Sequence, residues 1–370
     1  MQKHIISLDI DENLVVATQL QKKSNAFYLV RQATAANLES LAKESFLKHA
    51  GVLINIPTQA VLLRTFAVKA SLLNNKKELL KFLTRQNLPF KLEECFWDTF
   101  FLDNNLQFIA AKKETVDGYI GQVEALGFEV MGVNTSSIAL YNVFIHNYNK
   151  QERVALLNIR NSVSDLLIYE PGYLSPYPIS VGKSAIMQSE ESLTNFCTEV
   201  QGIFSAHYLQ HPGRSKTFNS FYLSGEYTSL GLISSLKKIS EVLEIKALEP
   251  LNKIRVEGAV NVTNPQVLAL SLGLSLTYFK APGCIKLNLI NERKRIQGRL
   301  SRMNLVRKAG LFFIILCLAL LSFYDISRIY ILKKERSIFN INQRLISDFL
   351  PQLNALKQKK EQIQNSISLL

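Results

Sequence analysis

The segment Gly182-Lys183-Ser184 is the stretch of the chain that looks most like a phosphate-binding loop. A P-loop also needs a glycine five residues earlier, because its backbone N–H groups surround the phosphates. Tyr177 stands at that position, so we interpret the segment as a structural turn. No Ser/His/Asp or Cys/His order stands out, and we expect no catalytic residue. The cysteines form no CxxC pair, which argues against a zinc site and a disulfide framework and favours a reducing cytosol: Cys95, Cys197, Cys284 and Cys317.

The positive charge of the chain is unevenly distributed. The 370 residues carry a net charge of +13, and 47% of them are apolar, which fits a globular chain and excludes a disordered one. Residues 285–308 hold +7 and residues 325–370 hold +4, which leaves +2 for residues 1–284. Because the basic regions flank an apolar segment, membrane topology explains them better than DNA does. Nucleic-acid binding by residues 286–308 is the alternative, and it predicts a DNA affinity that falls with salt.

A single membrane span is predicted from Ala309 to Tyr324, sixteen residues without a charge. As a helix this stretch rises about 24 Å, slightly less than the roughly 30 Å hydrocarbon core of a bilayer. Residues 293–308 contain seven Lys/Arg and residues 325–340 contain four, which favours a cytoplasmic N-terminal side. No signal peptide precedes residue 30. We therefore expect a single-pass protein with a cytoplasmic N-terminus; the alternative is a buried core helix.

Residues 325–370, after the span, are predicted to form a helical coiled coil. Some of them follow a 3-4-3-4-3 spacing with one lysine in the seam: Leu353, Leu356, Lys360, Ile363, Ile367 and Leu370. We expect Pro351 to break or kink the helix before this run. Two short heptad runs make a weak coiled coil alone, so a partner helix is expected; the alternative is a frayed tail.

Two copies of one local pattern lie about 150 residues apart in the chain. Residues 4–20 and 154–169 each read as an apolar strand, a polar turn and a second apolar strand. The repeat predicts a duplicated, two-lobed α/β fold. Residues 51–57 and 62–68 are expected to pair as strands. Further predicted elements are a strand at 106–113 and helices at 76–86, 116–126 and 264–276.

Residues 87–102 and 110–144 resemble the inserted small domain of PilM, the actin-like cytoplasmic component of type IV pilus assembly. The matching positions are Leu88–Phe90, Leu92–Glu94, Val116, Asp117, Tyr119 and Gly127. Asn134 stands where that family usually has Asp. The likeness runs in order over roughly residues 4–280. It implies an actin-like (RNase H-like, duplicated) two-lobed α/β fold with an inserted small α+β domain.

The resemblance also implies an order of domains along the chain. An actin-like domain followed by a span is, in addition, the layout of the L component of type II secretion systems. We expect the first lobe to start at 1–50, an inserted domain at 51–133, a return to the first lobe at 134–153, a second lobe at 154–280, a linker at 281–308, the span at 309–324 and an extracytoplasmic coiled coil at 325–370.

Residues 285–296 resemble the N-terminus of PilN, which begins with a peptide that docks into a groove on PilM. Leu287, Asn288 and Leu289 match that docking peptide, and Ile290-Asn291 replaces its usual Leu-Pro. The residues support docking by themselves, because alternating leucines can present two apolar side chains to a pocket. The Asn288 amide can hydrogen-bond the backbone of a groove. An ordinary linker strand is the alternative, and docking in cis or in trans stays open.

The resemblance further implies where an actin-like ATPase would hold nucleotide. Such a site needs two Gly/Ser-bearing hairpin turns, whose N–H groups approach the phosphates, and an Asp for the metal-bound water. The matching positions are degenerate in this chain, because glycines are lost and carboxylates would face a polyphosphate: Asp9, Asp11, Asn13, Asn158, Arg160 and Gly225. We therefore expect no ATP hydrolysis and no resident cofactor, although Mg-ATP binding stays open as the alternative.

Together these resemblances imply a structural component of a bacterial inner-membrane assembly platform, in a type IV pilus or a type II secretion-like machine. The expected partners are the assembly ATPase, platform proteins, and a PilO-like protein that pairs with the coiled coil, in a homo- or heterodimer. The alternative function is a nucleotide-binding actin-like switch that regulates the same assembly.

Overall fold

The computed structural model describes residues 5–47, 50–68, 76–86, 88–148, 152–210, 218–226, 230–239, 244–258 and 260–367. The chain divides into two compact units, Met1–Glu292 and Arg293–Leu370. All the described strands belong to the first unit, and the second unit belongs to one long helix.

The first lobe is built on a six-stranded sheet with the order β14-β3-β2-β1-β4-β8. The strands are β1 (Ile5–Ile10), β2 (Val15–Lys23), β3 (Ala26–Ala35), β4 (Gly51–Ile56), β8 (Glu129–Thr135) and β14 (Ile254–Val256). The first three strands form an antiparallel meander, whereas β4, β8 and β14 pair in parallel with their neighbours. All six residues of β4 are buried, as is typical of a parallel strand that is covered on both faces.

The second lobe repeats this topology. Its strands are β9 (Val154–Ile159), β10 (Ser164–Glu170), β11 (Tyr173–Ile179), β12 (Ser220–Gly225) and β13 (Ile245–Ala247). Their order, β11-β10-β9-β12-β13, and their directions match β3-β2-β1-β4-β8 strand for strand. The duplicated two-lobed α/β fold predicted from the repeated pattern is confirmed.

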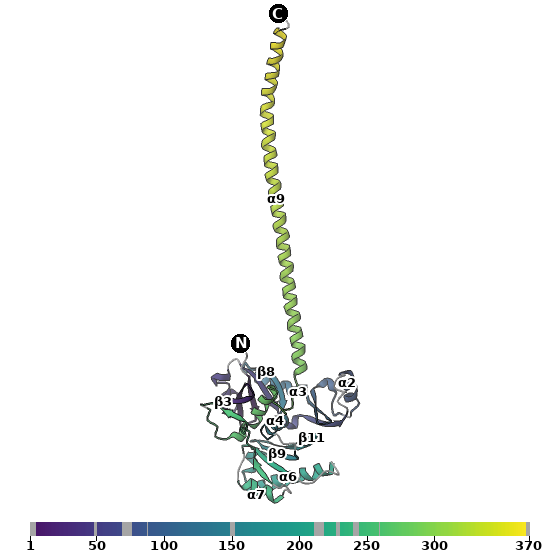
Figure 1. The fold of residues 1–370 in the computed structure, drawn as a ribbon, viewed down its shortest axis with the longest axis vertical. Coiled ribbons are helices and arrows are strands. Elements are labelled where there is room, and N and C mark those ends of the chain that lie inside the picture. Colours follow the sequence, from purple (N-terminus) through teal and green to yellow (C-terminus); the bar gives the residue numbers. More distant parts are fainter. Residues whose placement is uncertain are drawn as a thin grey trace. The chain divides into compact units, whose positions relative to one another are not determined.

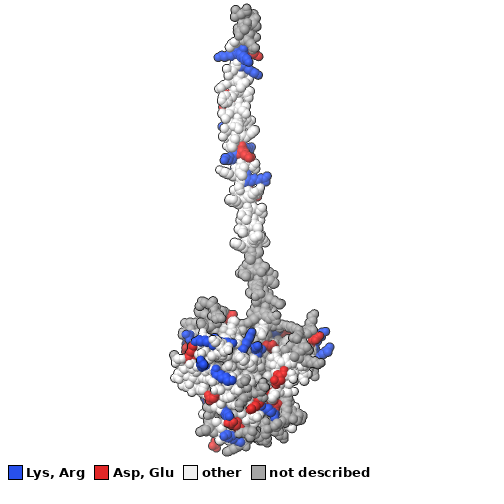
Figure 2. Space-filling model, in the orientation of Figure 1, with Lys and Arg blue, Asp and Glu red and all other residues white. Residues whose placement is uncertain are grey.

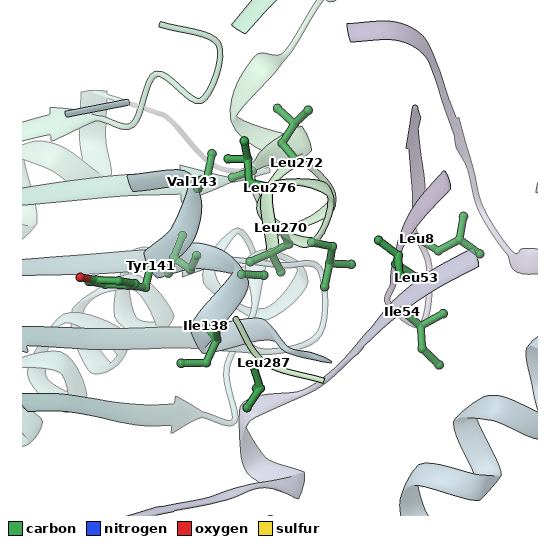
Figure 3. Close-up of a cluster of buried hydrophobic side chains, with 14 of the residues drawn as sticks. Leu8, Leu53, Ile54, Ile138, Tyr141, Val143, Leu270, Leu272, Leu276 and Leu287 are labelled. Atoms are coloured by element: carbon green, nitrogen blue, oxygen red, sulfur yellow. The ribbon is translucent and has the colours of Figure 1, made fainter. Parts of the chain in front are cut away.

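Helices α4 (Ser136–Tyr148) and α8 (Ala269–Tyr278) pack against each other in the main hydrophobic core (Figures 1 and 3). Their backbones come so close at Gly273 that an added Cβ would lie 2.0 Å from the Ala139 carbonyl oxygen. Helices α6 (Glu190–Gln210) and α7 (Leu230–Ile239) lie together on the second lobe and share its separate core. The other helices are α1 (Leu38–Leu41), α3 (Lys113–Glu124) and α5 (Lys183–Ile186).

An inserted domain interrupts the first lobe. It contains a three-stranded antiparallel sheet, β5 (Leu62–Ala67), β7 (Asn105–Lys112) and β6 (Cys95–Leu102), in the order β5-β7-β6. Helix α2 (Lys76–Thr84) packs on this sheet through Leu79 and Leu83 and forms a third hydrophobic core.

Two of the expected domain boundaries differ from the structure. The insert was expected at 51–133, but β4 and β8 both pair within the first-lobe sheet, and β5 pairs with β7 instead of β4. β4 is buried along its whole length and mostly apolar, which suits an interior strand and explains its place in the large sheet. The second lobe was expected to reach residue 280, but β14 pairs with β3 and α8 packs on α4, so the chain returns to the first lobe earlier.

Helix α9 (Asn291–Ile367) includes the predicted span. Among the described residues one helix, over Phe312–Ile363, is long and apolar enough by length and composition to cross a membrane, and its most apolar stretch is not buried in the chain. Figure 2 shows the first described side chains of α9 as an uncharged stretch that precedes the charged residues. Pro351 was expected to break or kink the helix; the helix continues through it without a break, and the kink stays a prediction. The coiled coil stays a prediction, and residues 368–370 of it lie outside the described residues.

Candidate functional site

The two hairpin turns at which an actin-like ATPase would hold phosphates meet each other directly. The first joins β1 to β2 and is closed by a hydrogen bond from the Asp11 amide to the Leu14 carbonyl (3.0 Å). The second joins β9 to β10 and is closed in the same way, from the Arg160 amide to the Val163 carbonyl (3.0 Å). The equivalent hairpins of the duplicated lobes therefore face each other.

Arg160 crosses from the second lobe into the first. Its Nη2 donates to Asp9 Oδ1 (3.1 Å) and to the carbonyl oxygen of Ile10 (2.5 Å). Asp9 Oδ1 also accepts a hydrogen bond from Asn55 Nδ2 on β4 (3.0 Å). The guanidinium therefore bonds a side chain and the backbone of the opposite hairpin.

Asp11 bonds in the reverse direction, from the first lobe to the second. Its carboxylate accepts hydrogen bonds from the Asn161 amide (3.0 Å) and the Ser162 hydroxyl (2.9 Å), and lies 3.9 Å from Arg160 Nε. The backbone N–H of the second turn that could have approached a phosphate is thus bonded to a carboxylate of the protein itself. We call the contacts of Asp9, Asp11 and Arg160 the interlobe cluster.

The interlobe cluster is buried. The side chains of Arg160 and Asp9 are 6% and 10% exposed. Burial raises the pKa of Asp9, and Arg160 only partly offsets this rise. Burial also raises the pKa of Asp165, on β10. Burial acts to lower the pKa of Arg160, but the carboxylates outweigh it, so the net pKa of Arg160 is raised. Arg160 therefore carries its charge in a setting of low polarity, where its ion pairs are strong.

The remaining residues predicted for the nucleotide site, Asn13, Asn158 and Gly225, do not belong to the interlobe cluster. Asn13 is exposed at the tip of its turn, and Asn158 is buried on β9. Gly225 ends β12 with φ +94°, and a Cβ there would lie 2.0 Å from the Ile159 carbonyl oxygen. Glycine is required at that position by the close approach of β12 to β9, whether or not a ligand binds.

The Gly182-Lys183-Ser184 segment is a structural turn, as expected. The amides of Lys183 and Ser184 donate to the carbonyl oxygens of Arg160 (2.8 Å) and Asn161 (3.0 Å), so neither is available to a phosphate. Lys183 Nζ is 3.1 Å from Glu226 Oε2. Among the described residues no group of His, Cys, Asp and Glu is arranged to hold a metal ion.

The predicted docking peptide, Leu287–Leu289, lies with its neighbours, residues 285–290, on its own globular unit, and we call residues 285–290 the docked segment. Leu287 and Leu289 are 4% and 2% exposed and belong to the main hydrophobic core. Lys286, which precedes them, is exposed, and Asn288 between them is half-buried. Figure 3 shows Leu287 on the segment that passes below Ile138 of α4. The alternation expected from the sequence is therefore the alternation of buried and exposed side chains.

Asn288 bonds the edge of the first-lobe sheet. Its Oδ1 accepts a hydrogen bond from the Val133 amide of β8 (3.1 Å), and the Leu289 amide donates to the Val133 carbonyl (2.9 Å). The Asn288 amide in turn donates to Asp98 Oδ2 on β6 of the insert (3.2 Å). The segment therefore joins two parts of the unit, and residues 284–290 of the expected linker are packed structure.

Two polar residues that hold this segment were not identified from the sequence. Asn142, in the apolar helix α4, exchanges two hydrogen bonds with the Ile285 backbone (2.7 and 2.9 Å). Asp98 is the single charge in the aromatic strand β6, and burial raises its pKa although two amide donors act against that rise. In both cases the signal was a polar residue with apolar neighbours, because buried polar groups need partners.

No protein-family model matches the chain, and no curated protein matches it in sequence. Solved structures do match. A chain of the PilM–PilN type IV pilus biogenesis complex superposes with a TM-score of 0.61 at 17% identity, covering 75% of this chain and 98% of that one. The cytoplasmic domain of EpsL, an inner-membrane component of the Vibrio cholerae type II secretion system, gives a TM-score of 0.46 at 10% identity, covering 78% and 98%.

A Bacteroides thetaiotaomicron protein with an actin-like ATPase fold and unknown function gives a TM-score of 0.41 at 12% identity, covering 68% of this chain and 93% of that one. The duplicated sheets with their shared strand order and the match to the PilM–PilN chain agree. The globular unit has the actin-like fold that the resemblance implied.

Proposed function

We propose that the chain is a structural, membrane-anchored component of a pilus or secretion-type assembly machine. The observation that carries the proposal is the docked segment at residues 285–290, which is followed at Asn291 by the first residue of α9. The chain therefore continues from the docked segment straight into the helix that contains the candidate span. Similarity to the PilM–PilN chain, from a complex of type IV pilus biogenesis, supports this proposal.

In this proposal the chain combines in one polypeptide a PilM-like domain and the PilN-like peptide, span and coiled coil. The actin-like unit lies in the cytoplasm of a bacterial cell beneath the inner membrane, and residues 325–370 pair with a partner helix on the other side. The assembly ATPase and platform proteins bind the cytoplasmic unit. Those partners do the mechanical work, and this chain anchors them at the membrane and transmits that work.

The interlobe cluster supports a role without ATP hydrolysis. Its residues do not fit Mg-ATP, because Arg160 is bonded to Asp9 of the opposite hairpin and the Asp11 carboxylate already holds the Asn161 amide. The carboxylates of Asp11 and Glu12 would also repel phosphates. A cavity of about 200 Å³ lies beside these turns, and its two charged residues, Lys183 and Glu226, are paired with each other. It is the place where nucleotide would bind under the alternative of an actin-like switch.

Deletion of the gene in its host, followed by complementation, tests the proposal. The full chain should restore pilus formation or secretion, whereas residues 1–292 alone should not, because the anchor is lost. A Lys183→Met variant should restore it as well as the natural chain does. Loss of function in that variant, together with micromolar binding of Mg-ATP to the purified full chain in a calorimeter, would support the nucleotide switch instead.

A further inference from the structure

A cavity of about 260 Å³ opens beside the docked segment on the first lobe. The buried part of its apolar lining comes from three elements and the segment itself: Leu53 and Ile54 of β4, Val133 of β8, Leu274 of α8, and Leu287. Met131 and the exposed Tyr278 also line it. The chain's own docked segment forms one wall of the cavity and leaves the cavity open. The buried apolar residues form the floor of the cavity. This floor suits an apolar side chain of another molecule, because such a side chain makes van der Waals contacts that water cannot replace.

The rim of this cavity is cationic. Lys280 and Lys286 both line it and both are exposed. Within the described part of the chain neither lysine has an ion pair with a carboxylate. The nearby Asp98 carboxylate accepts the amides of Asn288 and Thr99 instead.

The backbone at Lys280 adds a second observation. Lys280 follows the end of α8 with φ +52°, the left-handed conformation that usually selects glycine or asparagine at this position. A lysine there carries a conformational cost that glycine would not. The residue is thus held in an unfavourable conformation while its charge lies at the mouth of an apolar cavity, which is a pattern found at binding sites.

We infer that this cavity, with Lys280 and Lys286 at its rim, docks an acidic peptide of a partner protein, with one apolar side chain on the floor and a neighbouring carboxylate at the lysines. The chemistry is complementary in both parts: an apolar side chain leaves water for the buried floor, and a carboxylate gains two unpaired ammonium groups. The inference does not depend on the proposed function, because it rests on the cavity and its charges alone.

The test uses the purified full chain in detergent and an array of synthetic hexapeptides. Each peptide has Leu, Ile, Phe or Met at its third position and varied residues elsewhere. We expect the bound peptides to be enriched in Asp and Glu next to the apolar residue. The tightest of them should lose at least tenfold in affinity for a Lys280→Glu/Lys286→Glu variant.

A charge-matched control keeps the test specific. Lys237 and Lys253 are exposed and do not line the cavity, so Lys237→Glu/Lys253→Glu should bind the same peptide as the natural chain does. Unchanged circular dichroism shows that each variant is folded. Absence of acidic enrichment, or an equal loss in both double variants, would overturn the inference. Self-association of the chain that is abolished only by Lys280→Glu/Lys286→Glu would overturn it in favour of a second copy as the occupant.

Discussion

Replacing Arg160 by methionine tests whether the interlobe cluster holds the lobes together. The change keeps much of the aliphatic volume and removes the guanidinium, which leaves Asp9 and Asp11 without their counter-charge. Removal of one partner of a buried ion pair costs about 3–5 kcal/mol. The full range applies because the two paired side chains are only 6% and 10% exposed. For a unit of this size the expected fall in Tm is roughly 6–10 °C.

The same variant should acquire a distinctive dependence on pH. The pKa values of Asp9 and Asp165 are already raised by burial, so both bind protons more tightly in the folded protein than in the unfolded chain. Their contribution to the free energy of unfolding is therefore present at low pH and is lost as pH rises through the raised pKa. Arg160 lowers both pKa values, so its removal moves this loss to higher pH. Arg160→Met should be weakest near about pH 8 and should recover part of its stability near about pH 5.

Thermal unfolding of the full chain in detergent, followed by circular dichroism at both pH values, measures these effects. Arg255→Met, at an exposed arginine on β14, is the matched control and should change Tm little. Adding Asp9→Asn to Arg160→Met should restore part of the loss, because one uncompensated carboxylate is removed. The reasoning fails if Arg160→Met costs no more than the control, or if its penalty is the same at both pH values.

Three further changes test the rest of the structure. Asp98→Ala should lower the free energy of unfolding by about 1–3 kcal/mol in a guanidinium titration. Asp98→Asn keeps one of the two acceptors and turns an NH2 group toward the other amide donor, so it should cost less than Asp98→Ala but not nothing; no cost in either variant would show that these hydrogen bonds do not stabilise the unit. Asn288→Ala should raise hydrogen exchange at the Val133 amide roughly tenfold, and unchanged exchange would mean that this bond does not hold the segment. Gly225→Ala should destabilise the unit by on the order of several kcal/mol, as much as a defect in the hydrophobic core, because the added Cβ would clash with the backbone. Gly118→Ala, in an open helical position, should be neutral or slightly stabilising, and a similar loss in both would contradict the steric argument.

Much of the fold could be predicted from local pattern. The two strand–turn–strand repeats predicted the duplicated lobes, because the spacing of apolar residues and the choice of turn residues are local properties of the sequence. The placement of β4 could not be obtained in the same way, since the pairing partners of a mostly apolar, fully buried strand are decided by tertiary packing. The return of β14 and α8 to the first lobe is likewise a long-range property that the local sequence of those elements does not encode.

The candidate sites were predictable in type but not in geometry. Loss of glycine and gain of carboxylates in the first turn indicated a degenerate phosphate site, because like charges repel. Nothing in the sequence indicated that Arg160 would cross to Asp9 and Ile10, since that contact depends on how the duplicated hairpins face each other. The docking segment showed its alternation of leucines, but its anchors Asn142 and Asp98 lie more than a hundred residues away in the chain.

The interlobe cluster and the docked segment have one physical property in common, which is that their contacts are intramolecular. Each is a set of contacts between distant parts of the sequence, made within one chain. An intramolecular contact competes at an effective concentration on the order of mM for a short tether, so it needs little intrinsic affinity to stay formed. The docked segment is joined to α8 by residues 279–284 alone, and its anchors include four buried apolar side chains, of Ile285, Leu287, Leu289 and Ile290. A separate peptide could displace the segment only if its binding free energy exceeded the combined contribution of the tether and of that buried apolar surface. The cavity beside the segment is therefore the part of the groove that remains open to a partner.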